Sequence, residues 1–354
     1  MNMKLQVPVR RIRQALQHVE RYIKSCCHDD LDTPPLSPLR EGEWDLILTA
    51  HHRIVHQGKK VKALPHHVQT LVRDCESVLE LVKPFWPQLQ MDGLRNVWIV
   101  KPGAQSRGRG IFLLNHLEEI LALVQSPLIY QTKYVVQKYM ERPLLIYNTK
   151  FDIRQWFMVT DWNPLTVWMY KDSYLRFCSQ QYDLTNNDEA IHLSNNAIQC
   201  KYMNGARDNN LPDENMWDCH QFKDYLRSKG QEDAYEKIIH PGMKDALIAT
   251  MLAAQVQMDS FKHGFEFFGA DFMLTEDLRV WLIEINSSPC MAYTTSVTKR
   301  MSFECLNDTI KVVVDYRQNK SADTGKFELI YHDKEKSVAS LPYYGVTLQV
   351  DIFI

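Results

Sequence analysis

The chain has 354 residues, of which 45% are hydrophobic and 24% are charged, and its formal net charge is -2. This balance is typical of a folded protein with room for two or three domains, and it argues against a disordered or fibrous chain. The near-neutral charge excludes a global electrostatic field that would draw the protein to nucleic acid or anionic membrane, so we expect neither partner. An acidic partner would have to meet a local basic patch.

The eight cysteines are scattered without a C-x-x-C pair, which is typical of reduced cytosolic thiols. The N-terminus lacks the apolar segment of a signal peptide, and no stretch reaches the ~20 apolar residues that a membrane span needs. We therefore expect a soluble, cytoplasmic protein.

The first part of the chain predicts helices around a loop. Apolar residues recur every three or four positions over 11–27 and over 65–83, and Pro84 ends the second helix. Residues 29–43 are rich in proline and acidic residues and predict a loop.

From Val97 onward the pattern predicts strands and helices in alternation. Residues 150–160 and 165–178 predict a long strand pair joined by a turn at 161–164. Residues 183–216 are polar and predict a loop. The other predicted strands are 98–100, 110–114, 134–140, 265–274 and 279–286, and the other predicted helices are 116–125, 217–229, 241–262 and 295–316.

The segment from Gly269 to Pro289 has an informative polar pattern. Glu284 and Asn286 lie two apart in one strand and share a face, and the hairpin can bring Asp271 opposite them. Three oxygen donors on one face suit Mg²⁺, which keeps its other positions for phosphates. A solvated polar face is the alternative, but the apolar flanks indicate a buried strand pair, where unpaired carboxylates would be costly. The sequence therefore favours a metal site.

Residues 96–114 form a second pattern of strand, Lys101, glycine-rich loop and strand. Backbone N–H groups of such a loop can cover phosphates as a flap. It is not a Walker loop, because no G-K-[ST] follows and the next element is a strand. A plain basic hairpin remains the alternative.

In a third pattern, Lys150, Asp152 and Arg154 alternate along one predicted strand and share a face, and Arg176 lies on the neighbouring strand. A buried face with these charges would line a polar cleft. The alternative is a surface ladder of cross-strand ion pairs.

In this order the motifs resemble those of ATP-grasp ligases, most closely the tubulin–tyrosine-ligase-like family, over about residues 95–316. The motifs that carry the resemblance are "WIVKPGAQSRGRGI", "VVQKYMERPLL", "KFDIRQW", "YLRF", "HLSNNAIQ" and "FGADFMLTEDLRVWLIEINSSP". Within the family, "VTDWNPLTVWMYKDSYLRF", "HPGMK" and "DTIKVVVD" are most similar to the glycine-adding branch, the initiating tubulin glycylases.

The resemblance implies an α+β ATP-grasp fold, with the nucleotide bound between central and C-terminal α/β lobes and with a smaller N-terminal lobe. The implied parts are residues 1–95 for the N-terminal lobe with its Pro-rich loop, 96–149 for the central lobe with its flap, 150–316 for the C-terminal lobe with the Mg²⁺ site, and 317–354 for a polar linker and tail expected to be partly disordered.

The resemblance also implies roles for individual residues. Arg154 would face the γ-phosphate, Arg176 would steady a substrate carboxylate, and Glu284 would complete the catalytic set. The implied metal ligands are Asp271, Glu284 and Asn286. The implied nucleotide-binding residues are Lys101, the flap residues Ser106, Arg107, Gly108, Arg109 and Gly110, the hinge residues Gln137, Lys138, Tyr139 and Met140, and then Lys150, Asp152, Ser194 and Asn195.

The implied reaction uses ATP and Mg²⁺ to convert a glutamate side chain of an acidic tubulin tail into an acyl phosphate, which the amine of free glycine attacks. We expect a monomer acting on microtubules of cilia and axonemes. A glutamylase or another amino-acid ligase of the family is the alternative in the same class. A non-catalytic nucleotide- or microtubule-binding module would be expected to lack Arg154 or part of the metal trio, and all these residues are present.

An acidic tail would need a basic landing surface on this nearly neutral chain. The alternative for any one basic residue is a solvated charged face. The candidates are Arg10, Arg11, Arg13, His51, His52, Arg53, Lys59, Lys60 and Lys62.

Overall fold

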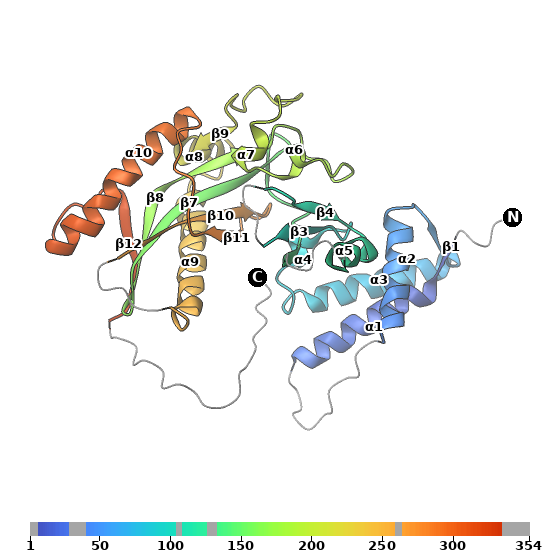
Figure 1. Cartoon of the computed structure of the whole chain (residues 1–354). Coiled ribbons are helices and arrows are strands. Elements are labelled where there is room, and N and C mark those ends of the chain that lie inside the picture. The colour runs from blue at the N-terminus through green and yellow to red at the C-terminus, as the bar shows by residue number, and fades with distance from the viewer. Residues whose placement is uncertain (1–5, 28–39, 104–107, 126–132, 259–263, 335–354) are drawn as a thin grey trace. The chain divides into compact units, whose positions relative to one another are not determined.

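The structure is a computed structural model that describes residues 6–27, 40–103, 108–125, 133–258 and 264–334 (Figure 1). The chain divides into two compact units. Unit 1 comprises Met1–Ala104 and Ile111–Arg142, and unit 2 comprises Gln105–Gly110 and Pro143–Ile354. Among the described helices, none combines the length and apolar character needed to cross a membrane.

Unit 1 combines helices with two small sheets. Its elements are β1 (Gln6–Pro8), α1 (Val9–Cys26), α2 (Glu41–Val55), β2 (Lys60–Lys62), α3 (Pro65–Val82), α4 (Leu89–Asp92), β3 (Trp98–Pro102), β4 (Phe112–Leu114), α5 (Leu117–Gln125) and β5 (Tyr134–Lys138). β1 pairs in parallel with β2, while β3 lies between β4 and β5 in an antiparallel sheet. Pro65 begins α3, where the missing N–H of proline costs nothing.

Unit 2 is built on a larger sheet. Its elements are β6 (Leu145–Ile146), β7 (Thr149–Trp162), β8 (Leu165–Phe177), α6 (Glu189–His192), α7 (Asn196–Gln199), β9 (Met216–Asp218), α8 (Cys219–Ser228), a π-helical turn (Tyr235–Ile239), α9 (His240–Gln255), β10 (Glu266–Leu274), β11 (Val280–Asn286), α10 (Ser296–Ile310), a second π-helical turn (Lys311–Tyr316) and β12 (Phe327–His332). The strand order is β11-β10-β7-β8-β12, with every neighbouring pair antiparallel. β6 pairs with β7, and β9 pairs with β8.

The alternation of side chains along β7 separates two apolar clusters. Ile153 and Phe157 pack with residues of α8 and α9 on one face of the sheet. Trp156 and Met158 point to the other face and pack with residues of α10. Because both faces are covered, β7 and β8 are buried along most of their length, which makes them a rigid support for charged side chains.

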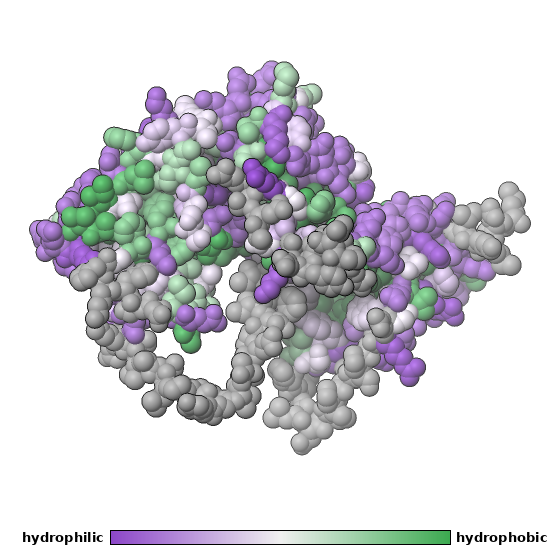
Figure 2. Space-filling model, viewed as in Figure 1, coloured by the Kyte–Doolittle hydropathy of each residue, from purple (hydrophilic) through white to green (hydrophobic). Residues whose placement is uncertain are grey.

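The outer side of α10 also carries apolar residues. Figure 2 shows apolar residues gathered over this helix and the turn that follows it. The exposed residues there recur at intervals of three or four, so they form one stripe. They are Phe303, Leu306, Ile310 and Val314.

Most predicted elements are present, and the mixed helix and sheet content is confirmed. The structure differs from the prediction at several places, and the segment 183–216, predicted as a loop, contains the short helices α6 and α7. α2 begins within the predicted 29–43 loop, and residues 28–39 lie outside the described part of the chain. The helix predicted over 241–262 ends at Gln255. The segment 317–354, predicted as a polar linker and tail, contains β12, whose Phe327 is buried and pairs with Tyr170 of β8.

Candidate functional site

The centre of the candidate site is an ion pair between neighbouring strands of unit 2. Arg154 on β7 lies directly opposite Asp271 on β10. Its Nε donates to Oδ1 at 2.5 Å and its Nη2 donates to Oδ2 at 3.1 Å. Both side chains are buried. This two-point contact fixes the plane of the guanidinium group.

Arg176 on β8 extends the pair into a network. It lies opposite Asp152 of β7 and donates to both oxygens of that carboxylate, at 2.7 and 2.6 Å. Its Nη2 also lies 2.9 Å from Oδ2 of Asp271. Cross-strand ion pairs are therefore present, as the ladder interpretation predicts, but they are buried rather than on the surface.

The network favours the charged forms of Asp271 and Arg176. Burial opposes ionisation of Asp271, but the positive charges of Arg176 and Arg154 outweigh it and hold the pKa of Asp271 below its usual range. Burial acts to lower the pKa of Arg176, but Asp152 and Asp271 outweigh it, so its pKa lies above the ordinary value. Two carboxylates and two guanidiniums thus balance one another's charge.

The three predicted metal ligands converge at the β10–β11 edge. Asp271 and Glu284 face each other across the ladder. The Asn286 Nδ2 lies 3.5 Å from Oδ2 of Asp271 and 3.4 Å from Oε1 of Glu284. Rotation of the amide would present Oδ1 instead, so the three side chains offer the oxygen donors that suit Mg²⁺. Both Asp271 oxygens contact arginine here, so metal ligation by this carboxylate would require those contacts to be exchanged.

Gly269 leaves the space that Arg154 occupies. A Cβ atom at this position would lie 3.0 Å from Arg154 Nη1 and 2.8 Å from the Pro289 Cβ. Any side chain at Gly269 would therefore displace the guanidinium or the following loop. Nothing in the sequence pattern singled out this glycine.

Lys150 and the 186–194 segment form a second part of the site. The Lys150 Nζ donates to the His192 carbonyl at 2.7 Å, and the His192 Nε2 lies 2.7 Å from the Asn186 carbonyl. Burial lowers the pKa of His192 to about 4, so its ring is neutral at pH 7. Lys150 thus holds this segment against β7. His192 begins the motif "HLSNNAIQ", but the sequence predicts no role for its side chain.

Two predicted nucleotide-binding segments of unit 2 lie together. Gly108 of the flap has a φ of 77°, a left-handed conformation that favours glycine. A Cβ atom there would lie 2.7 Å from the Ile198 Cγ1 and 3.4 Å from the Asn195 Oδ1. Asn195 is the N-cap residue of α7, and Ser194 before it is buried.

The rest of the predicted flap is only partly described. Ser106 and Arg107 lie outside the described residues. Arg109 is exposed, and Gly110 has a φ of 66°.

Unit 1 holds the predicted hinge strand and Lys101. Lys101 lies on β3 opposite Val135, and Gln137 lies on β5 opposite Ile99. Tyr139 and Met140, which follow β5, are buried.

The hinge lysine belongs to a network that the sequence pattern does not predict. The Lys138 Nζ donates to the Asp92 carbonyl at 2.9 Å and to the Glu141 Oε1 at 3.0 Å. The buried Glu141 also accepts from the backbone N–H groups of Arg95 and Val97, at 2.7 and 2.8 Å. A carboxylate directly after the buried Tyr139 and Met140, in "KYME", is a signal that could have indicated it. Glu141 therefore positions Lys138 and the start of β3.

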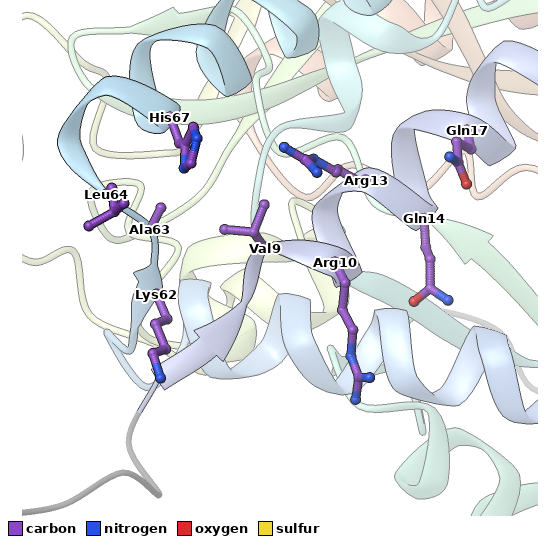
Figure 3. Close-up of a pocket in the computed structure, with 9 residues that line it drawn as sticks. All are labelled: Val9, Arg10, Arg13, Gln14, Gln17, Lys62, Ala63, Leu64 and His67. Carbon is purple, nitrogen blue, oxygen red and sulfur yellow. The ribbon is translucent and has the colours of Figure 1, made fainter.

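Part of the predicted basic surface lines a hollow of unit 1 with a volume of about 640 Å³ (Figure 3). Arg10 and Arg13 of α1 line it together with Lys62 and His67. No ion pair joins either arginine or the lysine to a carboxylate of the described residues. In Figure 3 the Arg13 side chain extends toward His67, while Arg10 and Lys62 extend to the other side of Val9.

The histidines of that predicted surface contribute little charge. Burial lowers the pKa of both His51 and His52, so both rings are neutral at pH 7. The His51 Nε2 lies 3.0 Å from the Leu94 carbonyl, which gives it a structural contact.

Comparisons with known proteins agree with this arrangement of motifs. The chain is 47% identical to tubulin glycylase 3A of Drosophila melanogaster over 92% of this chain and 33% of the relative. It is 46% identical to tubulin monoglycylase TTLL3 of Homo sapiens over 97% of this chain and 44% of the relative. It is 42% identical to protein monoglycylase TTLL8 of Mus musculus over 94% of this chain and 40% of the relative. The chain thus spans less than half the length of each of these relatives. The profile of the tubulin-tyrosine ligase family matches residues 48–322, and the chain belongs to this family.

Proposed function

We propose that this chain is an ATP-dependent ligase that adds glycine to the γ-carboxyl group of glutamate side chains in tubulin tails. The observation that carries the proposal is the 46% identity to a tubulin monoglycylase over 97% of this chain. The complete set of proposed site residues, including Arg154 and the metal trio, supports catalysis over a purely binding role.

The proposed chemistry activates a carboxylate that would otherwise be a poor electrophile. ATP supplies the phosphoryl group for an acyl phosphate, and Mg²⁺ held by Asp271, Glu284 and Asn286 would offset charge on the triphosphate. Lys101 would hold phosphate oxygens, and Arg154 would face the transferred group. Arg176 would steady the acceptor carboxylate. The flap would exclude water until the amine of glycine attacks and phosphate leaves.

The arginine network gives this proposal a physical basis. Arg154 and Arg176 are already oriented by carboxylates at 2.5–3.1 Å. Anionic substrate oxygens would replace Asp271 as their partners, and Asp271 would then be available to hold Mg²⁺. A preformed pair of guanidinium groups stabilises charge with little reorganisation, which is the usual source of electrostatic catalysis.

We also propose that the acidic tail lands on the basic hollow formed by Arg10, Arg13 and Lys62. Arginines and lysine without a carboxylate partner among the described residues are suited to glutamate side chains. The protein would act as a monomer with ATP-grasp lobes, on microtubules of cilia and axonemes.

The proposed activity is tested by incubating the protein with MgATP, tubulin and labelled glycine or glutamate, followed by mass spectrometry of the tails. We expect glycine additions on glutamate side chains. Additions of glutamate alone would contradict the proposal. Glu284→Gln should abolish the additions, whereas Glu276→Gln on the turn of the same hairpin should retain them.

A further inference from the structure

A second group of potential metal ligands lies elsewhere in unit 2. Asp172 of β8 and Cys219 and His220 of α8 each place one donor atom within 4.8 Å of the other two. The Cys219 Sγ lies 3.7 Å from the Asp172 Oδ1, and the His220 Nε2 lies 3.8 Å from the same oxygen. No other such group of His, Cys, Asp or Glu is found among the described residues.

The local fold explains why these residues meet. β9 pairs with β8 so that Asp218 lies opposite Tyr174. α8 begins at the next residue, which brings Cys219 and His220 beside Asp172. Asp218 caps the helix by accepting from the His220 backbone N–H at 3.0 Å, and this contact fixes the first turn that carries both residues.

The separations suit tetrahedral zinc. With Zn–S near 2.3 Å and Zn–N or Zn–O near 2.0 Å, tetrahedral angles place the ligand atoms about 3.3–3.6 Å apart. The observed 3.7 and 3.8 Å exceed these values by a few tenths of an ångström. The His220 side chain is 63% exposed, so small rotations of its ring can close the remaining gap.

The surrounding charges leave one Asp172 oxygen for a cation. Lys326 donates to Oδ2 of Asp172 at 2.8 Å and is itself shared with Glu304 at 2.8 Å. Burial opposes ionisation of Asp172, but Lys326 outweighs it and keeps the pKa of Asp172 below its ordinary value. Oδ1 therefore carries anionic charge and faces the thiol and the imidazole.

We propose that Asp172, Cys219 and His220 form a zinc site whose fourth position is taken by water. A thiolate and an imidazole select Zn²⁺ or Co²⁺ over Mg²⁺, which prefers oxygen donors, so this site is distinct from the proposed Mg²⁺ site. The metal would join the start of α8 to β8, four residues before Arg176 on that strand.

Binding is coupled to loss of the Cys219 proton. Burial raises the pKa of the Cys219 thiol to about 12, so the thiol is neutral at pH 7 before the metal binds. Formation of the Zn–S bond releases this proton to the buffer. One proton should be released for each metal ion bound.

The absorption spectrum of bound Co²⁺ shows directly whether a thiolate is one of its ligands. The full chain is titrated with Co²⁺ without ATP, glycine or tubulin, so the result does not depend on ligase activity. We expect a thiolate-to-cobalt charge-transfer band that saturates at one ion per chain, disappears when Zn²⁺ is added and is unaffected by Mg²⁺. Absence of this band in the unaltered protein would overturn the proposal.

Variants identify the ligands. Cys219→Ser should remove the band, whereas Cys305→Ser, which alters another buried cysteine, should retain it. His220→Ala changes an exposed side chain, so the fold should persist while metal affinity falls by more than the about 10- to 100-fold that loss of a hydrogen-bond partner of a ligand costs. Lys326→Met removes a competing cation and should tighten binding. A band that survives Cys219→Ser, or an unchanged affinity in His220→Ala, would show that other residues bind the metal.

Discussion

Replacement of Asp271 by asparagine tests whether the buried carboxylate holds the two arginines of the candidate site. The change keeps the shape of the side chain and removes its negative charge. Arg154 and Arg176 would then share a neutral amide, with only Asp152 remaining as a carboxylate in the network. We expect unit 2 to lose stability.

The geometry sets the size of this loss. Three guanidinium contacts at 2.5, 3.1 and 2.9 Å end on the Asp271 carboxylate. Each hydrogen bond to a charged group contributes about 1.5–3 kcal/mol. An asparagine oxygen keeps one of them, so the loss should reach about 3–5 kcal/mol, the usual cost of breaking a buried ion pair.

Hydrogen exchange measures this loss in the right place. The exchange free energy of amides in the β7–β10 ladder reports the opening of the part of unit 2 that contains the ion pair. Asp277→Asn on the turn of the same hairpin is the control, because its pair with Arg279 is partly exposed and an asparagine oxygen can still accept from the Thr275 hydroxyl, so the loss should be less than about 1 kcal/mol. A loss of unfolding free energy below about 1 kcal/mol in Asp271→Asn would show that the Asp271 carboxylate does not hold the two arginines.

The same pair predicts a pH dependence. The folded-state pKa of Asp271 lies below the value of about 3.9 for an unfolded aspartate. The unfolded chain therefore binds the proton first, and the stability from this group is fully present above pH ~4 and falls as the pH drops through the folded pKa. In Asp271→Asn the free energy of unfolding should fall less between pH 5 and pH 3 than it does in the unaltered protein, and denaturation at these two pH values measures the difference.

Three further changes probe the surroundings of the site. Gly269→Ala should displace Arg154 and lower the proposed ligase rate about 100-fold. Gly42→Ala is the control and should leave the rate unchanged, because a Cβ atom there has no neighbour within 4 Å. Equal rates in the two variants would show that the space at Gly269 does not position Arg154. His192 has a pKa of about 4 in the folded protein and about 6.5 in the unfolded chain, so its contribution to stability is present above pH 6.5 and falls as the pH drops toward 4. In His192→Gln, the free energy of unfolding measured by denaturation should not fall over this pH range for this reason. Glu141→Gln removes a buried carboxylate that accepts three hydrogen bonds and should cost unit 1 about 3 kcal/mol or more in hydrogen exchange, and a neutral result would show that these bonds add nothing.

The parts of the fold that could be predicted from the sequence are those with a local signal. The strand patterns of 150–160 and 165–178 and the turn signal between them located β7 and β8, because an Asp-, Asn- and Pro-containing turn is a local signal. The strand-turn-strand pattern placed Asp271 opposite Glu284, and their register confirms that placement. α2 was missed because its first residues continue a loop-like acidic segment and its apolar spacing is interrupted by histidines.

The partners in the candidate site depend on contacts between distant segments. Asp271 lies 117 positions from Arg154, and only the β7–β10 register reveals that the two side chains pair. The alternating charges on β7 predicted either a polar cleft or a surface ladder of ion pairs. The charged side chains are buried, so the ion pairs lie inside unit 2. Sequence spacing likewise gives no indication that Asp172 meets Cys219, 47 positions away.

The position of β12 determines how short a stable version of this protein can be. The family profile ends at residue 322, before this strand begins. A chain cut at that point would keep every proposed site residue but would expose the hydrogen-bonding edge of β8 and the aromatic face of Tyr170, which Phe327 covers. An unpaired strand edge of this kind invites pairing between chains. A fragment of this chain intended for biochemical work should therefore extend at least through His332, so that the edge of β8 stays covered.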